Sequence, residues 1–293
     1  MSGIFDRLQG FRSTLLNLGL ASSKLYFVKV DVQGAFDNIP QAAVQQLIAG
    51  LLSEDHYYIK RHTEFKPPDT YGAHNADVIF KPTRKFCSEA AADFSAATFI
   101  KAIAARPPQS RRHNTVYVDG VVPDTHRRSY ILELLSEHIG ANVVRIGKKF
   151  YRQKKGIPQG SVLSSLLCNL FYGGFEAEHL GFLQEERSLL MRLIDDFLLI
   201  TTDKKKATRF LQIMHDGSPE HGICIKPEKS LANFGAKINR HTVPELASGK
   251  TFPYCGILLD QKNLNILKDY SSSRAGGTCW HSTSLRHEIT NWL

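Results

Sequence analysis

Two apolar runs in this sequence carry acidic residues at positions where a buried strand ordinarily holds another aliphatic side chain. The first run, "KLYFVKVDV", spans residues 24–32 and contains Asp31; the second, "LIDDFLLIT", spans residues 193–201 and contains Asp195 and Asp196. β-Branched and aromatic residues predict a strand in each run. If the two strands are neighbours in one sheet, three carboxylates meet at one edge, and a cation is needed to offset their mutual repulsion.

Magnesium ions fit that need, because Mg²⁺ binds few carboxylates and keeps coordination positions for substrate phosphates. Two such ions, about 3.5–4 Å apart, can activate an attacking 3′-hydroxyl group and stabilise the leaving pyrophosphate. The pattern therefore fits nucleotide polymerisation. A plainer interpretation stays open at this point, because a single Asp at a strand end often serves a turn or a helix cap, and an Asp-Asp pair is ordinary in hairpin turns.

The charge balance of the chain favours an acidic partner. Lys and Arg number 37 against 28 Asp and Glu, which gives a formal net charge of +9 at pH 7, a balance often found in proteins that bind nucleic acid. The five cysteines are far apart and form no C-x-x-C, which argues against a disulfide framework or zinc ribbon and favours a reducing compartment. The twelve histidines form no H-x-x-x-H zinc pattern, and no apolar run approaches the ~20 residues that span a bilayer.

The hydrophobic pattern predicts an α+β fold with an antiparallel sheet. Beyond the two acidic strands, it predicts a helix over 88–105 capped by Ser88 and a helix over 124–140 that is capped by Asp124 and ends at Gly140. It also predicts a turn over 34–41 and a hairpin turn near Gly147. The remaining expected elements are helices over 1–20, 41–52, 161–183 and 204–217, strands over 56–65 and 115–122, a hairpin over 189–203, and strands within 222–234 and 251–267.

Five segments together resemble the motifs of telomerase reverse transcriptase. Residues 31–40 are similar to motif A, and "KKGIPQGSVLSSLLCNLFYGGFE" (154–176) is similar to motif B′. Residues 193–201, 222–234 and 253–260 are similar to motifs C, D and E in that order. Leu193 and Ile194 precede the paired acids where retroviral enzymes carry a tyrosine, and the segment between motifs A and B′ is long, as in telomerases.

The resemblance implies a right-hand polymerase palm with an antiparallel sheet and a telomerase-type fingers insertion over about residues 42–142. It implies an N-terminal helix over 1–23 as a remnant of the fingers, palm and fingers over 24–272, and a divergent tail over 273–293. The family's motifs 1 and 2 before residue 24, and a thumb after motif E, have no counterpart in these residues, so we expect a palm without much of the template grip.

The same resemblance implies catalytic roles for individual residues. Asp31, Asp195 and Asp196 correspond to the catalytic acids, with Asp31 and Asp195 as the principal ligands of two Mg²⁺ ions and the carbonyl of Val32 as an added ligand. Lys229 corresponds to the motif D lysine, which can protonate or neutralise the leaving pyrophosphate. Without the motif, Lys229 would be an ordinary solvated lysine.

Further residues are implied in substrate binding. Phe36 occupies the place of an aromatic gate against the ribose 2′-hydroxyl group, although a core aromatic is the plainer alternative. Gln159 and Gly160 correspond to positions against the incoming nucleotide, where glycine lets the backbone approach closely. The primer grip corresponds to Tyr254, Cys255 and Gly256. "KKFYRQKK" (148–155) mixes charge with aromatic residues and suggests a contact with backbone phosphates.

The implied function is RNA-templated addition of deoxynucleotides to telomeric DNA 3′ ends by an RNA-directed DNA polymerase, a nucleotidyltransferase. The implied partners are a telomerase RNA template, single-stranded telomeric DNA and deoxynucleoside triphosphates, within a ribonucleoprotein at telomeres in the nucleus, with no membrane. Two alternatives stay open. One is a truncated, inactive palm that only binds nucleic acid or partner subunits; the other is a retroelement or group II intron-type reverse transcriptase, which lacks the long insertion.

Overall fold

The computed structural model describes residues 2–67, 82–92, 104, 114–120, 123–247 and 249–268, and the chain divides into two compact units. The first unit comprises Met1–Val44 and Val143–Leu293, and the second comprises Gln45–Asn142. The predicted divergent tail (273–293) lies outside the described residues, as does most of the segment 93–113.

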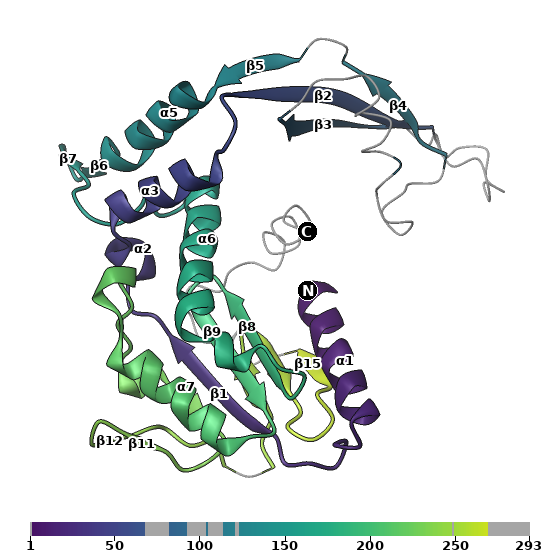
Figure 1. Cartoon of the computed structure of the whole chain (residues 1–293), viewed down its shortest axis with the longest axis vertical. Helices are drawn as coiled ribbons and strands as arrows, with labels where there is room; N and C mark the ends of the chain where they lie inside the picture. Colours follow the sequence, from purple (N-terminus) through teal and green to yellow (C-terminus); the bar gives the residue numbers. More distant parts are fainter. Residues whose placement is uncertain are drawn as a thin grey trace. The chain divides into compact units, whose positions relative to one another are not determined.

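A four-stranded antiparallel sheet forms the centre of the first unit (Figure 1), and its strand order is β10-β1-β9-β8. β1 (Tyr26–Asp31) lies between β10 (Leu231–Ala232) and β9 (Asp196–Thr201), and β8 (Ser188–Leu193) pairs with β9 as a hairpin. The pairing brings the two acidic runs together although more than half of the chain separates them. The antiparallel sheet predicted from the sequence is therefore present, and the acidic runs are neighbouring strands in it.

Helices cover the sheet of the first unit and exclude water from β1. On one face, α1 (Ser2–Asn17) places Leu8, Phe11 and Leu15 in a cluster with Phe27 of β1 and apolar side chains of β8, β9 and the C-terminal strands. α7 (Lys204–Asp216) lies against β1 and β9 outside that cluster and buries Phe210. Because both faces are covered, Phe27 and the valines that alternate with it are all fully buried.

The other elements of the first unit connect or flank this sheet (Figure 1). One of them, α3, starts in the first unit and continues into the second. These elements are α2 (Ala35–Asn38), α3 (Gln41–Leu51), β6 (Val143–Ile146), β7 (Lys149–Arg152), α6 (Val162–His179), the 3-10 helices η2 (Gly181–Leu183), η3 (Pro219–His221) and η4 (Pro227–Lys229), β11 (Lys237–Ile238), β12 (His241–Thr242), and the three-stranded sheet of β13 (Phe252–Tyr254), β14 (Ile257–Leu259) and β15 (Ile266–Lys268).

The second unit is organised around one long strand, β2 (His56–Lys66). β3 (Thr83–Ala91) pairs with one side of β2, and β4 (Val116–Asp119) and β5 (Asp124–Arg127) pair with the other. α5 (Arg128–Gly140) follows β5 directly. All of these pairs are antiparallel.

Two helix predictions in the second unit are wrong at their N-termini. Ser88, the predicted cap, lies in β3 opposite Arg61, and the strand continues to Ala91; the later part of the predicted helix lies outside the described residues. Asp124 lies in β5 and forms an ion pair with Arg61 at 2.7 Å, so α5 begins four residues later. In both cases β2 offers a long row of backbone partners, and cross-strand pairing overrides the local helix propensity.

Two shorter predictions also need correction. Residues 34–41, expected as a turn, contain the one-turn helix α2, which follows Gly34 at φ 56°. The helix predicted over 1–20 ends at Asn17, so Leu18 lies beyond its end and is 39% exposed. The hairpin turn at Gly147 is as predicted, with φ 62°.

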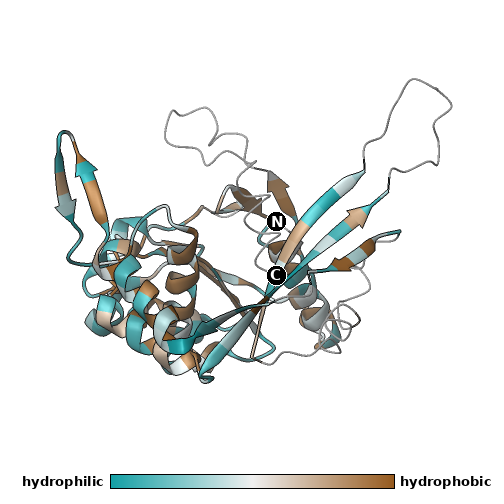
Figure 2. Cartoon of the chain, turned by 90° about the horizontal axis from the view of Figure 1, so that it is seen from above, coloured by the Kyte–Doolittle hydropathy of each residue, from teal (hydrophilic) through white to brown (hydrophobic). Residues whose placement is uncertain are grey.

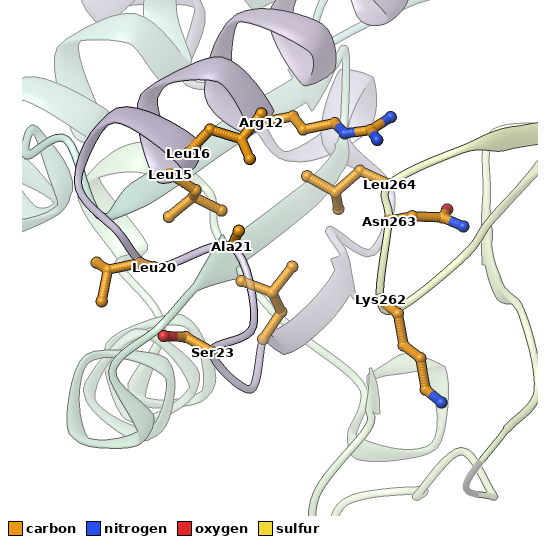
Figure 3. A pocket seen from close by; sticks show the side chains of 10 residues that line it. Arg12, Leu15, Leu16, Leu20, Ala21, Ser23, Lys262, Asn263 and Leu264 are labelled. Carbon is orange, nitrogen blue, oxygen red and sulfur yellow. The ribbon is translucent and has the colours of Figure 1, made fainter.

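A small pocket opens where the C-terminal end of α1 faces the loop before β15 (Figure 3). Its lining is mostly aliphatic, with Arg12 and Lys262 at its edge, and it includes none of the predicted site residues. Among the described residues, no helix is both long enough and apolar enough to cross a membrane.

Candidate active site

The three acids of the two apolar runs lie together at one end of the central sheet. Asp31, the last residue of β1, is the cross-strand partner of Asp196, the first residue of β9. Asp195 occupies the turn between β8 and β9 rather than a strand, and its carbonyl accepts a hydrogen bond from the backbone N–H of Val32 at 3.2 Å. Ile194, beside it in the turn, has φ 59°, as tight hairpin turns require.

Two lysines lie against this acidic cluster. Lys229 Nζ donates to Asp31 Oδ2 at 2.6 Å, and Lys29 Nζ lies 3.5 Å from Asp196 Oδ1. The hydrogen bond to Asp31, together with its charge, raises the pKa of Lys229, so this lysine stays protonated. Lys229 is therefore at the cluster, as the motif D resemblance implies, although η4, which carries it, lies far from both acidic strands in sequence.

The carboxyl group of Asp195 has a strongly perturbed pKa. Burial, and then the charges of Asp196 and Asp31, raise its pKa from 3.8 to about 6, against the opposing effects of a backbone hydrogen bond and Lys229. A carboxylate that ionises with difficulty beside two others is a site where a divalent cation is stabilising. The same feature is common in active sites.

The pKa of Asp195 predicts a pH-dependent stability change in Asp195→Asn. Because the folded pKa is raised, the contribution of Asp195 to the stability of the metal-free protein is fully present below about pH 4 and is lost as pH rises through 6. After a discount for partial exposure, the variant is expected to be more stable than the wild type by about 1–2 kcal/mol at pH 7.5. Urea unfolding in chelator at pH 4 and pH 7.5 measures this difference. A variant that is less stable than the wild type at pH 7.5 contradicts it.

The turn between β13 and β14 fixes the position of Asp196. Tyr254 Oη donates to the backbone carbonyl of Asp196 at 3.1 Å, and Cys255 Sγ lies 3.5 Å from Asp196 Oδ2. Burial raises the pKa of the Cys255 thiol, so it is protonated and able to donate. Cys255 and Gly256 both have positive φ, 45° and 75°, which is the signature of a tight hairpin turn. The three residues expected as a primer grip thus lie beside the acidic cluster.

The loop that leads into α6 is tied to the segment that follows Asp31. The backbone N–H of Ile157 donates to the carbonyl of Phe36 at 2.7 Å, and Gln41 Nε2 donates to the carbonyl of Gly156 at 2.9 Å. Gln159 and Gly160 are exposed at the end of this loop. Phe36 is half-buried, so it is not a fully buried core aromatic.

Three contributors to this geometry were not singled out from the sequence. At Gly156 a Cβ atom would lie 2.2 Å from the Phe36 carbonyl oxygen, and at Gly222 a Cβ atom would lie 2.3 Å from the Asn38 carbonyl oxygen. Both glycines have positive φ, so no other residue fits without movement. A Gly in a Gly/Pro-rich loop is the only sequence signal at these positions.

Arg192 is the third of these residues, and it joins α6 to the turn that carries Asp195. Its guanidinium group donates to Glu176 Oε1 at 2.5 Å, to Asn169 Oδ1 at 2.8 Å and to the Ile194 carbonyl at 3.1 Å. A charged residue inside an apolar strand, three positions before Asp195, was the available signal. Arginine is suited to this role because its fork of donors can bind several acceptors at once.

Comparison with known proteins gives the same picture. The profile of the reverse transcriptase (RNA-dependent DNA polymerase) family matches residues 121–258. The telomerase reverse transcriptase of Oryzias latipes is 35% identical over 272 residues, and those of Takifugu rubripes and Mus musculus are 32% and 31% identical; each alignment covers 91% of this chain. Over most of its length, the chain is therefore similar to a segment of telomerase reverse transcriptase. It spans 24%, 24% and 23% of those relatives, about a quarter of their length.

Solved telomerase structures have the same fold. The telomerase of Candida tropicalis in complex with a TWJ fragment of telomeric RNA matches 99% of this chain with a TM-score of 0.59 at 21% identity. That of Candida albicans, with the same kind of RNA fragment, matches 92% with a TM-score of 0.59 at 18% identity. The predicted right-hand polymerase fold is confirmed, and the telomerase resemblance drawn from motifs A to E is confirmed by the relatives.

Proposed function

We propose that this chain is the catalytic segment of a telomerase-type RNA-directed DNA polymerase, which extends telomeric DNA 3′ ends by copying an RNA template. The observation that carries the proposal is the meeting of Asp31, Asp195 and Asp196 at one end of the central sheet, with Lys229 hydrogen-bonded to Asp31. Homology to telomerase reverse transcriptases over nine-tenths of the chain supports it and makes a retroelement or group II intron enzyme the weaker alternative.

The acidic cluster fits divalent cations, and reverse transcriptases in general use them. Asp31 and Asp195, with the carbonyl of Val32, would hold two Mg²⁺ ions. The raised pKa of Asp195 supports this, because a cation offsets both the burial of its charge and the repulsion from Asp196 and Asp31. When bound, such ions supply an activated 3′-hydroxyl nucleophile and stabilise the leaving pyrophosphate. Lys229 stays protonated beside Asp31, and it would give a proton to the leaving group.

Asp196 depends on its neighbours for its orientation. Three groups contact Asp196: the hydroxyl group of Tyr254, which donates to its backbone carbonyl, the thiol of Cys255, and the ammonium group of Lys29. The first two come from β13 and the turn after it, and the third comes from β1. The β13–β14 turn would therefore have two tasks, namely holding Asp196 and receiving the primer 3′ end next to it. Gln159 and Gly160 would contact the incoming deoxynucleoside triphosphate.

The exposed hairpin of β6 and β7 is the proposed contact for nucleic-acid phosphates. It carries Lys148, Lys149 and Arg152 on its surface together with Phe150, which is 70% exposed. Figure 2 shows hydrophobic and hydrophilic segments side by side in this hairpin, at the left of the view. Cationic side chains beside exposed aromatic rings suit a single strand or a duplex end, where phosphates and base faces are both within reach. The RNA template and telomeric DNA of a nuclear ribonucleoprotein are the proposed partners.

Phe36→Ala tests the proposed discrimination between deoxyribonucleotides and ribonucleotides. A half-buried ring in the loop that follows Asp31 would block the 2′-hydroxyl group by its bulk. We expect the variant to incorporate ribonucleotides about 10- to 100-fold more efficiently than the wild type, because a steric clash worth about 1–3 kcal/mol is removed. Single-nucleotide incorporation with each sugar measures the ratio, and Phe182→Ala, an aromatic truncation in η2, is the control. An unchanged sugar preference contradicts the gate.

Primer extension tests the proposed function itself. The full chain is given a DNA primer annealed to an RNA template, Mg²⁺ and deoxynucleoside triphosphates, and product length is followed with time. Extension that stops when a chelator is added supports the polymerase. No extension by the folded wild-type chain, combined with measurable binding of the primer–template, supports the alternative of a palm that only binds nucleic acid.

A further inference from the structure

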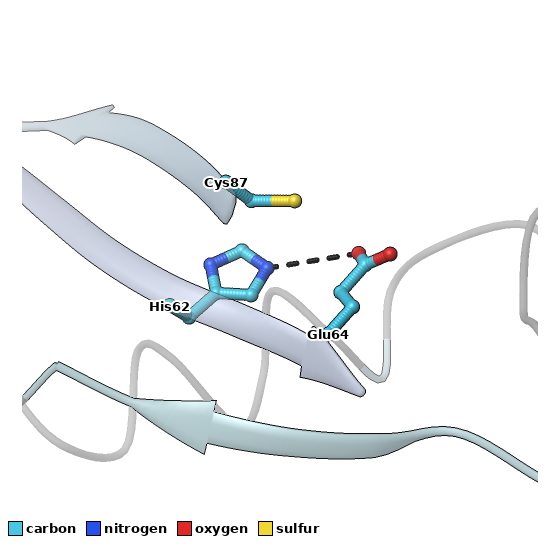
Figure 4. A group of neighbouring side chains, drawn as sticks. All are labelled: His62, Glu64 and Cys87. Atoms are coloured by element: carbon cyan, nitrogen blue, oxygen red, sulfur yellow. Dashed lines mark ion pairs between the residues drawn. The ribbon is translucent and has the colours of Figure 1, made fainter. Parts of the chain in front are cut away.

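Outside the acidic cluster, a second group of ligand-type side chains lies on the sheet of the second unit. His62 and Glu64 are two residues apart on β2, and Cys87 on β3 is the cross-strand partner of His62 (Figure 4). Residues two apart on a strand share a face, and antiparallel partners project from the same face. One nitrogen, one oxygen and one sulfur ligand atom here lie within 4.8 Å of one another.

Burial distinguishes this group from an ordinary surface cluster. The side chains of His62 and Glu64 are 1% and 5% exposed, and Nε2 of His62 lies 3.7 Å from Oε1 of Glu64. A buried carboxylate is costly unless a positive charge and good ligands are nearby. Lys60, two residues before His62 on β2, is also buried.

We propose that His62, Glu64 and Cys87 bind one Zn²⁺ ion. Zinc accepts imidazole nitrogen, carboxylate oxygen and thiolate sulfur at about 2.0–2.3 Å in tetrahedral geometry, in which neighbouring ligand atoms are roughly 3.3–3.8 Å apart. The distance of 3.7 Å between His62 Nε2 and Glu64 Oε1 is a few tenths of an ångström longer than the nitrogen–oxygen edge of such a site, so a small side-chain rotation would bring both atoms to one ion. The sulfur ligand favours zinc over Mg²⁺ or Ca²⁺, which take oxygen ligands.

The fourth position of such a site would be filled by water or by a side chain on the other side of β2. Asp119 of β4 is also a cross-strand partner of His62, so its side chain projects from the same face. A zinc ion held by β2, β3 and β4 would join three strands whose connections are long, and it would stabilise the sheet by reducing the freedom of those connections in the unfolded chain. Binding would release the thiol proton of Cys87 to solvent, because only the thiolate is a ligand.

One other group has ligand atoms within 4.8 Å of one another, and it consists of Glu178, His179 and His221. It is a weaker candidate for a metal site. Its side chains are exposed or half-buried, and His221 Nδ1 already lies 2.9 Å from Ser218 Oγ. It also contains no sulfur, so the two groups can be told apart by spectroscopy.

The test uses the full chain, freed of metal and then titrated with Zn²⁺ or Co²⁺. We expect one tightly bound zinc per chain, and a thiolate-to-cobalt charge-transfer band in the Co²⁺ form. Cys87→Ser should abolish the band and weaken zinc binding about 100-fold or more, since even the loss of an outer-sphere partner costs 10- to 100-fold. Cys224→Ser is the matched control at an exposed thiol. Cys255→Ser is a second control, which tests whether the band comes from the thiol beside the acidic cluster. Both control variants, Cys224→Ser and Cys255→Ser, should keep the band.

Circular dichroism verifies that each variant is folded. If Cys87→Ser does not fold, Glu64→Gln replaces it, because the amide keeps the size of the side chain; the band should remain while zinc affinity falls at least about tenfold. The proposal is overturned if the wild-type chain takes up no zinc, if the band survives in Cys87→Ser, or if zinc affinity is unchanged in Glu64→Gln. None of these outcomes depends on whether the chain extends a primer.

Discussion

Replacing Asp195 with alanine is expected to abolish primer extension while leaving the first unit folded. The side chain lies in the turn at the centre of the acidic cluster, where it would hold a metal ion. Loss of about 4 kcal/mol of transition-state stabilisation, a moderate value for a metal ligand, corresponds to a rate decrease of ~10³-fold or more. Since the substitution also removes one of three like charges, no large loss of stability is expected in metal-free buffer.

The experiment compares single-turnover extension rates of wild type, Asp195→Ala and Asp31→Ala. Asp6→Ala is the matched control, because Asp6 is an exposed acid on α1 rather than at the strand ends that carry the acidic cluster, and its removal changes the net charge equally. Both cluster variants should be inactive and the control active. Asp31→Ala also frees Lys229, so its thermal stability should fall more than that of Asp195→Ala. Equal rates in Asp195→Ala and the control contradict the proposed site.

Gly156→Ala is expected to destabilise the protein strongly for the addition of a single methyl group. A Cβ atom there would lie 2.2 Å from the Phe36 carbonyl oxygen and 2.6 Å from Asp37 Cα, and φ is 73°. The left-handed conformation costs about 1–2 kcal/mol, and the clash adds a further ~1–3 kcal/mol or displaces the loop. A displaced loop breaks the hydrogen bond from Ile157 to Phe36. We therefore expect a loss of about 3 kcal/mol in the free energy of unfolding, with weaker nucleotide binding.

Gly147→Ala provides the matched control for this prediction. Gly147 also has positive φ, 62°. Within the described part of the chain, no atom beyond its two neighbours in sequence lies within 4 Å of the place that the added methyl group would take, so only the left-handed cost of about 1–2 kcal/mol applies. Urea unfolding gives the two stability differences, and the Michaelis constant for deoxynucleotides reports the position of the loop. Similar losses in the two variants would show that the close approach at Gly156 is unimportant.

The acidic cluster could be predicted from the sequence because it depends on two strong local patterns. Apolar runs with acids at their ends define strands that terminate in carboxylates, and Asp195 lies in a hairpin whose pairing follows from its own turn. The resemblance to motifs D and E also singled out Lys229 and Cys255, and both side chains lie against the acids. Their contacts with particular oxygen atoms were not predictable, because they depend on how the strands and loops pack.

The second unit shows the opposite situation. Ser88 and Ala91 belong to a segment whose residues favour a helix. They form part of β3 instead, because β2 offers a long row of backbone groups to pair with. Asp124 is a residue type that often caps helices, and here it forms an ion pair with Arg61 instead. The group of His62, Glu64 and Cys87 has no local spacing that a zinc pattern could match, since Cys87 joins it only through the register of β2 and β3.

The sequence alone determined which strands carry the acids, that these strands are apolar and belong in a sheet, and which family the motifs resemble. These properties depend on side-chain periodicity and on residues close together in the chain. The tertiary structure decided the register that sets Asp31 opposite Asp196, the carbonyl against which Gly156 lies, and the side chains that meet His62. Those features join residues far apart in the chain, and their energies come from packing and pairing that no short window of sequence contains.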